Sequence, residues 1–313
     1  MNLNVNFAGP LTTVVDGGRI GYMSVGFSAG GAMDVYSMRL ANILVGNEMD
    51  EGALEMTFMG IEAEFDCDAV IAITGADMSP TVNGKTVRLC EAFTVRKGDV
   101  LSMKTAENGM RAYLAVSGGF DIEKVMGSYS TNIKCGIGGY MGRKLKAGDS
   151  LPLKRSSRLV GERMAKAEKP YKKEITVRVI LGPQDDYFTK KGISDFLSSE
   201  YSVSEKSDRM GIRLLGNSVE NENGVDIISD AVAMGSIQIP ASGEPIIMMA
   251  DRQTTGGYAK IATVISADLR LVAQASVGTA IHFKAVNDRT AVCALKKQKN
   301  KLLRLKRKLN FTK

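Results

Sequence analysis

Six side chains that can form hydrogen bonds or ion pairs lie close together in the last quarter of the chain: Asp251, Arg252, Gln253, Thr254, Thr255 and Lys260. Cations and hydroxyl groups of this kind can hold an oxygen atom that gains negative charge during a reaction. A carboxylate among them balances part of the positive charge. The cluster is typical of a site that binds a polar or anionic small molecule.

Two apolar runs position these side chains. Residues 246–250 precede the cluster and residues 261–265 follow it, and both are typical of buried strands. Gly256 and Gly257 allow the backbone to approach another group closely or to adopt a positive φ. Polar groups between core strands need partners, because burying one unpaired costs about 1–3 kcal/mol. The partner is either a ligand or a neighbour in a hydrogen-bonded barrel corner; we favour a ligand, since loops on rigid strands commonly carry sites.

Two other polar segments lie in the same half of the chain. The turn Gly-Pro-Gln-Asp-Asp contributes Gln184 and Asp185 directly after a predicted strand, and the sequence Ser-Asp-Arg-Met-Gly contributes Asp208 and Arg209 between two others. For Asp208 and Arg209, a surface turn with a local Asp–Arg pair is as good an interpretation as a ligand contact, and both stay open.

A glycine-rich loop in the first half contains Gly30 and Gly31 and leads into a predicted helix that Asp34 caps. The apolar positions Tyr36 and Leu40 belong to the buried face of this helix. Free backbone N–H groups at such a helix start suit phosphate or carboxylate. The loop matches neither G-x-G-x-x-G nor the P-loop pattern, so it is weak support by itself.

The rest of the chain is typical of short strands joined by tight turns, such as Asn83-Gly84. Both halves have a strand, a polar loop, a short helix and then further strands, which predicts a mainly β protein of two related barrels. A charged stretch without apolar periodicity, residues 156–174, marks the boundary. We therefore expect one lobe over residues 1–160, a second over residues 170–290 and a basic tail over residues 291–313.

Composition excludes several classes of protein. The four cysteines are widely spaced and only one histidine is present, so neither a zinc site nor a disulfide framework is expected. No signal peptide and no apolar run approaching the ~20 residues of a membrane span are visible, and we expect a cytoplasmic protein with reduced thiols. Lys104 follows a methionine but does not precede one, which excludes covalent biotin on this chain.

The net charge of +7 comes from the C-terminus. Nine Lys or Arg residues and no acid lie beyond residue 295, and without them 32 basic residues face 34 acidic ones, a charge of −2. Leu302, Leu305 and Leu309 have helical spacing, so an amphipathic helix that touches nucleic acid or anionic lipid is one interpretation. We favour a solvated, frayed extension, because chain ends are commonly poorly tied down, and expect neither membrane nor nucleic acid as a partner.

Several motifs together resemble a known family. They are D-G-G-R-I-G-Y, G-G-A-M-D, G-P-Q-D-D, S-D-R-M-G-I-R-L and D-R-Q-T-T-G-G-Y-x-K-I-A-T-V-I-S-A-D-L, in this order between Pro10 and Phe283. The chain resembles the allophanate hydrolase subunit 2 group. That group contains the C subunit of the ATP-dependent 5-oxoprolinase, the Kip antagonist and the matching part of the urea carboxylase carboxyltransferase domain. Val15, Ala259 and the sequence Ser28-Ala29 depart from the family pattern without removing a charged group.

The resemblance implies two cyclophilin-like β-barrel lobes with a few short helices, in a protein that is active only in a complex. The partners implied are a B-subunit, which is Kip inhibitor-like, and an A-subunit, which hydrolyses the lactam. The complex opens 5-oxoproline to glutamate with ATP and Mg²⁺, and the poorly electrophilic amide is phosphorylated first. The alternatives are carboxyl transfer from biotin, as in urea carboxylase, and a regulatory role as the binding partner of a Kip inhibitor-like protein.

The resemblance also assigns roles to residues. Phosphoryl transfer requires cations that hold spreading negative charge and carboxylates that hold Mg²⁺. Catalytic roles fall on Lys260, Arg252, Asp251 and Arg209, and a weak metal-ligand role falls on Asp185. Substrate or nucleotide binding falls on the remaining candidates, Gln253, Thr254, Thr255, Gly257, Gln184, Asp208, Gly30 and Gly31. Neither the identity of the lactam or urea-like substrate nor nucleotide binding by this chain alone follows from the sequence.

Overall fold

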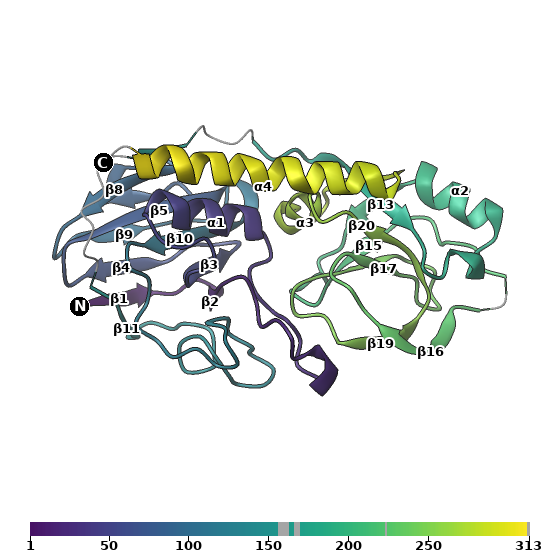
Figure 1. The fold of residues 1–313 in the computed structure, drawn as a ribbon, viewed down its shortest axis with the longest axis horizontal. Coiled ribbons are helices and arrows are strands. Elements are labelled where there is room, and N and C mark those ends of the chain that lie inside the picture. Colours follow the sequence, from purple (N-terminus) through teal and green to yellow (C-terminus); the bar gives the residue numbers. More distant parts are fainter. Residues whose placement is uncertain (156–162, 166–169, 223, 312–313) are drawn as a thin grey trace. The chain divides into compact units, whose positions relative to one another are not determined.

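The fold was analysed in a computed structural model, which describes residues 1–155, 163–165, 170–222 and 224–311 (Figure 1). The chain divides into two compact units. The first lobe contains residues 1–20, 30–170 and 300–313, and the second lobe contains residues 21–29 and 171–299. Most of the predicted linker, residues 156–162 and 166–169, lies outside the described residues.

Two six-stranded sheets form the first lobe. One sheet has the order β11 (Ser150–Pro152), β1 (Asn2–Phe7), β4 (Glu62–Phe65), β9 (Val100–Ser102), β6 (Thr81–Val82) and β7 (Lys85–Thr86). The other has the order β12 (Arg163–Met164), β8 (Glu91–Val95), β5 (Ala69–Asp77), β10 (Asn108–Val116), β3 (Ala53–Thr57) and β2 (Leu11–Val15). Leu3 and Phe65 from the first sheet and Ile73 and Leu114 from the second bury their side chains in one common core.

Helix α1 (Val35–Leu44) covers the other face of the second sheet (Figure 1). Its N-terminus is capped as predicted, because the Asp34 carboxylate accepts a hydrogen bond from the Ser37 backbone N–H at 3.0 Å. Tyr36 and Leu40 point into this second core. The predicted apolar face of the helix is therefore confirmed.

A closed seven-stranded barrel forms the centre of the second lobe. Its order is β13 (Glu174–Leu181), β20 (Lys260–Val264), β17 (Ser236–Gln238), β18 (Ile246–Met248), β15 (Gly211–Leu215), β14 (Glu200–Val203) and β21 (Ala280–Ala285). Beside it lie η2 (Asp185–Tyr187), α2 (Lys190–Ser198) and α3 (Leu269–Gln274). Phe196 of α2 stacks on Phe283 of β21 with ring centroids 4.5 Å apart, which fixes the buried face of α2 against the barrel.

A separate two-stranded ribbon completes the second lobe. It consists of β16 (Asp226–Ala231) and β19 (Thr255–Tyr258), which pair antiparallel. The short helix η1 (Met23–Val25) belongs to the same lobe, although it is far from it in sequence. The ribbon carries part of the polar cluster that the sequence singled out.

The basic tail forms an ordered helix, α4 (Asp288–Phe311), so the interpretation as a frayed extension was wrong. Leu302 and Leu309 are buried against the core beneath α1, and Leu305 packs beside them. Lys301 lies over the ring of Tyr36 at 5.4 Å from its centroid. The amphipathic spacing of the leucines indicated the helix. The sequence did not show that the first lobe offers an apolar surface to which these leucines bind.

The prediction of a mainly β protein with few helices is confirmed. All four cysteines are free thiols. Within the described part of the chain, no helix has the length and apolar character needed to cross a membrane.

Candidate functional site

Lys260 is the most deeply buried cation of the predicted cluster. It is the first residue of β20, and only 2% of its side chain is exposed. Its Nζ donates to Asp230 Oδ2 at 2.8 Å. Gln184 contacts both residues of this ion pair. Its Nε2 donates to Asp230 Oδ2 at 3.3 Å, and its Oε1 accepts from the Lys260 backbone N–H. The structure thus joins Gln184 and Lys260, as predicted, around a carboxylate that was not predicted.

Asp230 is half exposed, in contrast to its partner. The hydrogen bond from Lys260 holds the pKa of the Asp230 carboxyl below its usual value, with further contributions from the Ala231 backbone N–H and from Gln184. Asp230 is therefore a carboxylate at neutral pH. A solvent-exposed carboxylate can give up its lysine partner to another anion, because water can hydrate the carboxylate once the lysine no longer contacts it. The Lys260–Asp230 pair can therefore present a buried ammonium group to a ligand.

Arg209 and Asp251 form a second ion pair in this lobe. The guanidinium binds the carboxylate through two bonds, Nε to Oδ2 at 2.8 Å and Nη2 to Oδ1 at 3.0 Å. The Asp251 backbone N–H donates to the Arg209 carbonyl oxygen, which fixes the two segments to each other. Fork-to-fork geometry of this kind is strong and directional. The structure thus pairs Arg209 with Asp251, which is distant in sequence, rather than leaving the pair to be formed within a local turn.

Arg252 has no carboxylate within ion-pair distance among the described residues. Its Nε donates to the Val232 carbonyl oxygen at 2.8 Å, its Nη1 donates to the Met249 carbonyl oxygen at 3.3 Å, and its Nη2 lies 3.8 Å from Met23 Sδ. Burial alone lowers the pKa of the Arg252 guanidinium. A buried cation without a counter-charge favours the approach of an anion.

Of the three buried cations of the cluster, Arg209 pairs with Asp251 and Lys260 pairs with Asp230, whereas Arg252 pairs with no carboxylate among the described residues. The segment after Asp230 connects them, because Val232 accepts the bond from Arg252 and donates its own N–H to the Thr254 carbonyl oxygen. Within the described part of the chain, the Arg252 guanidinium thus has no carboxylate partner, and it suits a ligand that carries a carboxylate or a phosphate.

Gln253, Thr254 and Thr255 lead into strand β19 and do not form a loop of positive φ. At Gly256 a Cβ atom would lie 2.6 Å from Gln238 Nε2 and 2.8 Å from Gln253 Nε2, which are the ends of flexible side chains that can shift. Gly257 has more room, with the Ile227 carbonyl oxygen at 3.5 Å. Side-chain ends thus approach Gly256 closely, and a role of either glycine in ligand binding stays a prediction.

Two further carboxylates of the candidate site, those of Asp208 and Asp251, are occupied by groups of the chain itself. Asp208 Oδ1 accepts the backbone N–H groups of Met210 and Gly211, which shapes the turn before β15. Asp251 is held by Arg209. Over the described residues, no three His, Cys, Asp or Glu side chains gather as metal ligands. This donor set does not fit a metal held by the chain itself, so we derive no step through Mg²⁺, and the role of Asp185 stays a prediction.

Gly30 and Gly31 belong to the first lobe, whereas the remaining predicted site residues belong to the second. Both glycines have positive φ, of 59° and 90°. Gly31 packs against the turn at Gly18, where a Cβ atom would lie 3.0 Å from the Gly18 backbone. Their contribution to ligand binding stays a prediction.

Asp230 is the functional candidate that the sequence did not reveal. It lies in Asp-Ile-Ile-Ser-Asp, a short segment without a recognisable motif, thirty residues before its partner Lys260. The only signal was indirect: a buried lysine in a predicted core strand requires a counter-charge, and this segment offers one.

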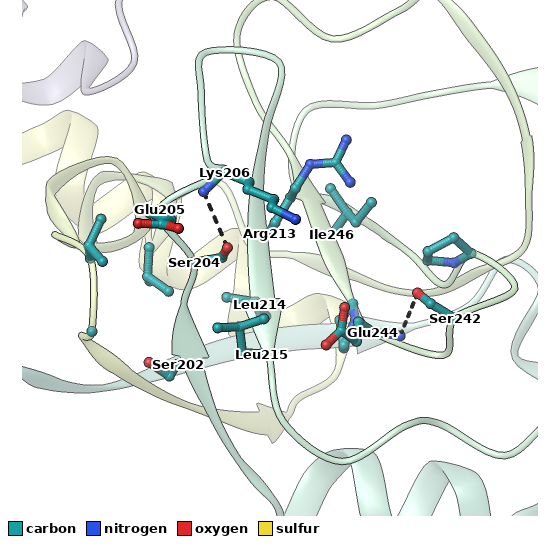
Figure 2. Close-up of a pocket in the computed structure, with 15 residues that line it drawn as sticks. Ser202, Ser204, Glu205, Lys206, Arg213, Leu214, Leu215, Ser242, Glu244 and Ile246 are labelled. Carbon is teal, nitrogen blue, oxygen red and sulfur yellow. Dashed lines mark hydrogen bonds between the residues drawn. The ribbon is translucent and has the colours of Figure 1, made fainter.

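A cavity of about 530 Å³ lies elsewhere on the second lobe (Figure 2). Arg213 and Leu215 of β15 point outward from the barrel, while the alternating residues Ile212 and Leu214 are buried. Other lining residues include Lys206, Glu244, Ile246 and Val277. None of the predicted site residues lines this cavity, whose charges are mixed and largely solvated.

Residues 25–285 match the model of the carboxyltransferase domain, subdomain A and B. The chain belongs to this carboxyltransferase family. Within the family it is 40% identical over 281 residues to the C subunit of 5-oxoprolinase from Escherichia coli, with 90% of each chain covered. It is 38% identical over 275 residues to the C subunit of 5-oxoprolinase from Haemophilus influenzae, with 88% of each chain covered.

Among solved structures of the carboxyltransferase family, urea amidolyase of K. lactis is similar, with a TM-score of 0.90 and 31% identity. The match covers 97% of this chain but only 20% of that enzyme, so the chain corresponds to one part of a much longer protein. The resemblance identified from the sequence motifs is confirmed, since the family and the named relatives agree with it.

Proposed function

We propose that this chain is the C subunit of an ATP-dependent 5-oxoprolinase complex that opens 5-oxoproline to glutamate. Similarity over about nine-tenths of the chain to two proteins that are named as C subunits of 5-oxoprolinase supports the assignment. The structural observation that carries it is the Lys260–Asp230 pair, a fully buried ammonium group held by a half-exposed carboxylate. A group of this kind can meet an anionic substrate without the cost of removing a water shell.

The reaction has two parts. The lactam oxygen attacks the γ-phosphorus of ATP, which releases ADP and leaves a phosphorylated imidate. Water then adds to the imidate carbon, and the C–N bond of the ring breaks as the nitrogen takes up a proton, which gives an acyl phosphate of glutamate. A second water hydrolyses this acyl phosphate to glutamate and phosphate. In the first part negative charge spreads over the transferred phosphoryl oxygens, and in the second it collects on the carbon-bound oxygen.

Each residue of the cluster has a role in this proposal. Lys260 donates to the oxygen that gains charge, after Asp230 turns away from it. The uncompensated charge of Arg252 attracts the carboxylate of 5-oxoproline or a phosphate toward the site. Arg209 holds Asp251 and thereby fixes the start of the segment that carries Thr254 and Thr255. No histidine or cysteine takes part, so no covalent enzyme intermediate is included.

The deciding experiment measures glutamate and ADP formation from 5-oxoproline and ATP, with the chain combined with its A and B partner subunits. The proposal requires equal amounts of both products and no turnover when this chain is omitted. Undiminished turnover by the A and B subunits alone would reject it.

A second candidate is carboxyl transfer from carboxybiotin, which the family model and the similarity to urea amidolyase favour. Lys260, Arg252 and Thr254 would then stabilise the enolate or imidate oxygen of the acceptor. The two candidates differ in their reagents. Bicarbonate and a biotin carrier are required only by the second, so 5-oxoproline turnover in bicarbonate-depleted, avidin-treated mixtures separates them.

A further inference from the structure

Ile228 is the most exposed large apolar side chain of the described residues, at 95%. It lies in β16 between Asp226, which pairs with Tyr258, and Asp230, which pairs with Gly256. Four steps along β16 thus correspond to two along β19, so the residues between the paired positions bulge out of the ladder. The bulge holds Ile228 away from every core and raises the question of what it contacts.

Two more exposed apolar side chains lie on the segments that surround the Lys260–Asp230 pair. Tyr258 is on β19, directly opposite Asp226. Tyr187 is three residues after Gln184, whose amide contacts Asp230. We call Tyr187, Ile228 and Tyr258 the Ile228 patch. Large apolar groups that stay in water around a polar site are typical of a surface that another molecule covers.

The surroundings of the Ile228 patch are acidic. Asp186, Glu222 and Asp226 are exposed, and none of them forms an ion pair with another described residue. Glu222 is tied to the patch, because its backbone N–H donates to the Tyr187 carbonyl oxygen at 3.1 Å. A partner that covers the patch must therefore offer an apolar hollow bordered by lysine or arginine.

A bulged ribbon flanked by carboxylates resists addition of another strand, which argues against an extended peptide as the occupant. A small molecule is also a poor fit, since Ile228 protrudes and forms no concave site. We propose that the Ile228 patch docks a partner protein of the complex, whose apolar hollow receives Ile228 and whose basic border faces Asp186, Glu222 and Asp226. The inference rests on the proposed function, because it uses the partner proteins of that complex, and it places the partner at the opening beside Asp230.

The test measures binding of the full-length chain to purified A and B subunits at two salt concentrations. Ile228→Lys removes the apolar contact and adds a charge that a basic border repels. We expect at least tenfold weaker assembly, with an unchanged thermal midpoint because Ile228 has no core contacts. Asp226→Lys should weaken assembly in the same direction, and wild-type binding should weaken as salt is raised.

Val277→Lys is the matched control. Val277 is also exposed, at 59%, and lines the barrel cavity of Figure 2 in the same lobe. It should assemble within twofold of wild type. Wild-type affinity of Ile228→Lys, or loss of assembly in Val277→Lys alone, would overturn the proposal. So would a wild-type chain that dimerises through Ile228 while the A and B subunits bind unchanged.

Turnover separates this inference from the proposed function. Ile228→Ala should regain full 5-oxoproline turnover once the partner concentration exceeds its weakened dissociation constant, because Ile228 positions the partner and touches no substrate. Assembly that depends on Ile228 without any turnover would refute the proposed reaction and leave the docking surface intact. If turnover depends on the concentration of the partner subunits in the same way in wild type and in Ile228→Lys, the docking surface is refuted and the proposed reaction is not.

Discussion

Both lobes place an aspartate near a buried arginine and a pair of glycines, but the two arrangements differ in what the aspartate binds. In the first lobe the sequence is Asp16-Gly17-Gly18-Arg19. Asp16 is almost wholly buried and accepts bonds from the Gly18 and Tyr129 backbone N–H groups and the Ser128 and Ser130 hydroxyls. Both carboxylate oxygens therefore accept hydrogen bonds from within the chain.

In the second lobe the carboxylates hold cations and stay open to solvent. Asp251 is 24% exposed and binds Arg209, and Asp230 is 50% exposed and binds Lys260. Neutral donors surround the first-lobe aspartate, whereas charge pairs that water can reach occupy the second lobe. A saturated network fixes a fold and has no capacity for a ligand, while an open ion pair can exchange its partner. We infer from this difference that the hydrogen bonds around Asp16 stabilise the first lobe, whereas the ion pairs of Asp230 and Asp251 are suited to binding a ligand.

Removal of residues 300–313 should cause the largest difference in stability between the two lobes. The truncation exposes the apolar surface beneath Leu302, Leu305 and Leu309, and at about 1.5–3 kcal/mol per fully buried leucine we expect a loss of about 4 kcal/mol. Urea unfolding followed separately for each lobe would show the loss in the first lobe. Arg307→Ala, on the exposed face of α4, is the control and should change little. An unaltered first-lobe transition would contradict the packing of the tail leucines and favour the interpretation as a frayed extension.

Asp16→Ala should come next in size. It leaves four donors without their acceptor in a buried site, and we expect the first lobe to lose about 3 kcal/mol. The counterpart Asp251→Ala should cost about 1 kcal/mol, because water can reach the place of the removed carboxylate and solvate the Arg209 guanidinium there. Denaturant midpoints of the two variants give the comparison directly. Equal losses would mean that both clusters are structural.

Asp149 extends the comparison to pH. Arg143 holds the pKa of this buried carboxyl below its usual value, as does the backbone N–H of Lys146. Its stabilisation is thus present above the unfolded-state pKa, near ~3.9, and is lost as the pH falls through the lower folded-state value. Asp149→Asn should lower stability at pH 7 by about 1–2 kcal/mol, and the difference from wild type should shrink as the pH falls below the unfolded-state pKa. A difference from wild type that is the same at every pH would contradict this role for the Arg143–Asp149 pair.

Asp230→Asn is the matched second-lobe variant, and its effect on stability should be the smallest of the set. Its carboxylate is half exposed and the asparagine oxygen can still accept the hydrogen bond from Lys260, so the midpoint of thermal unfolding should change less than in Asp149→Asn. A stability loss as large as that of Asp149→Asn would show that the Lys260–Asp230 pair holds the barrel together.

Local signals predicted much of the fold. The cap at Asp34, the helix after Thr189 and the strands on both sides of the Asp251 cluster depend on short-range preferences, which a sequence displays. Two features depend on contacts between distant segments. Asp230 meets Lys260 only because β16 folds beside β19, and α4 is ordered only because the first lobe offers an apolar surface to its leucines. The sequence around Lys260 does not show that Asp230 will be its partner, and the sequence around the leucines of α4 does not show the apolar surface that receives them.

Lys260→Met tests the central claim most directly. Methionine fills the volume of the buried lysine stem without its charge, whereas the shorter alanine would leave a cavity and confuse the result. In the reconstituted complex we expect 5-oxoproline turnover to fall about 10²-fold, the scale of one lost transition-state contact, with a thermal midpoint equal to or above that of wild type. A variant that melts early but turns over normally per folded molecule would show that Lys260 supports the barrel and that the chemistry occurs elsewhere.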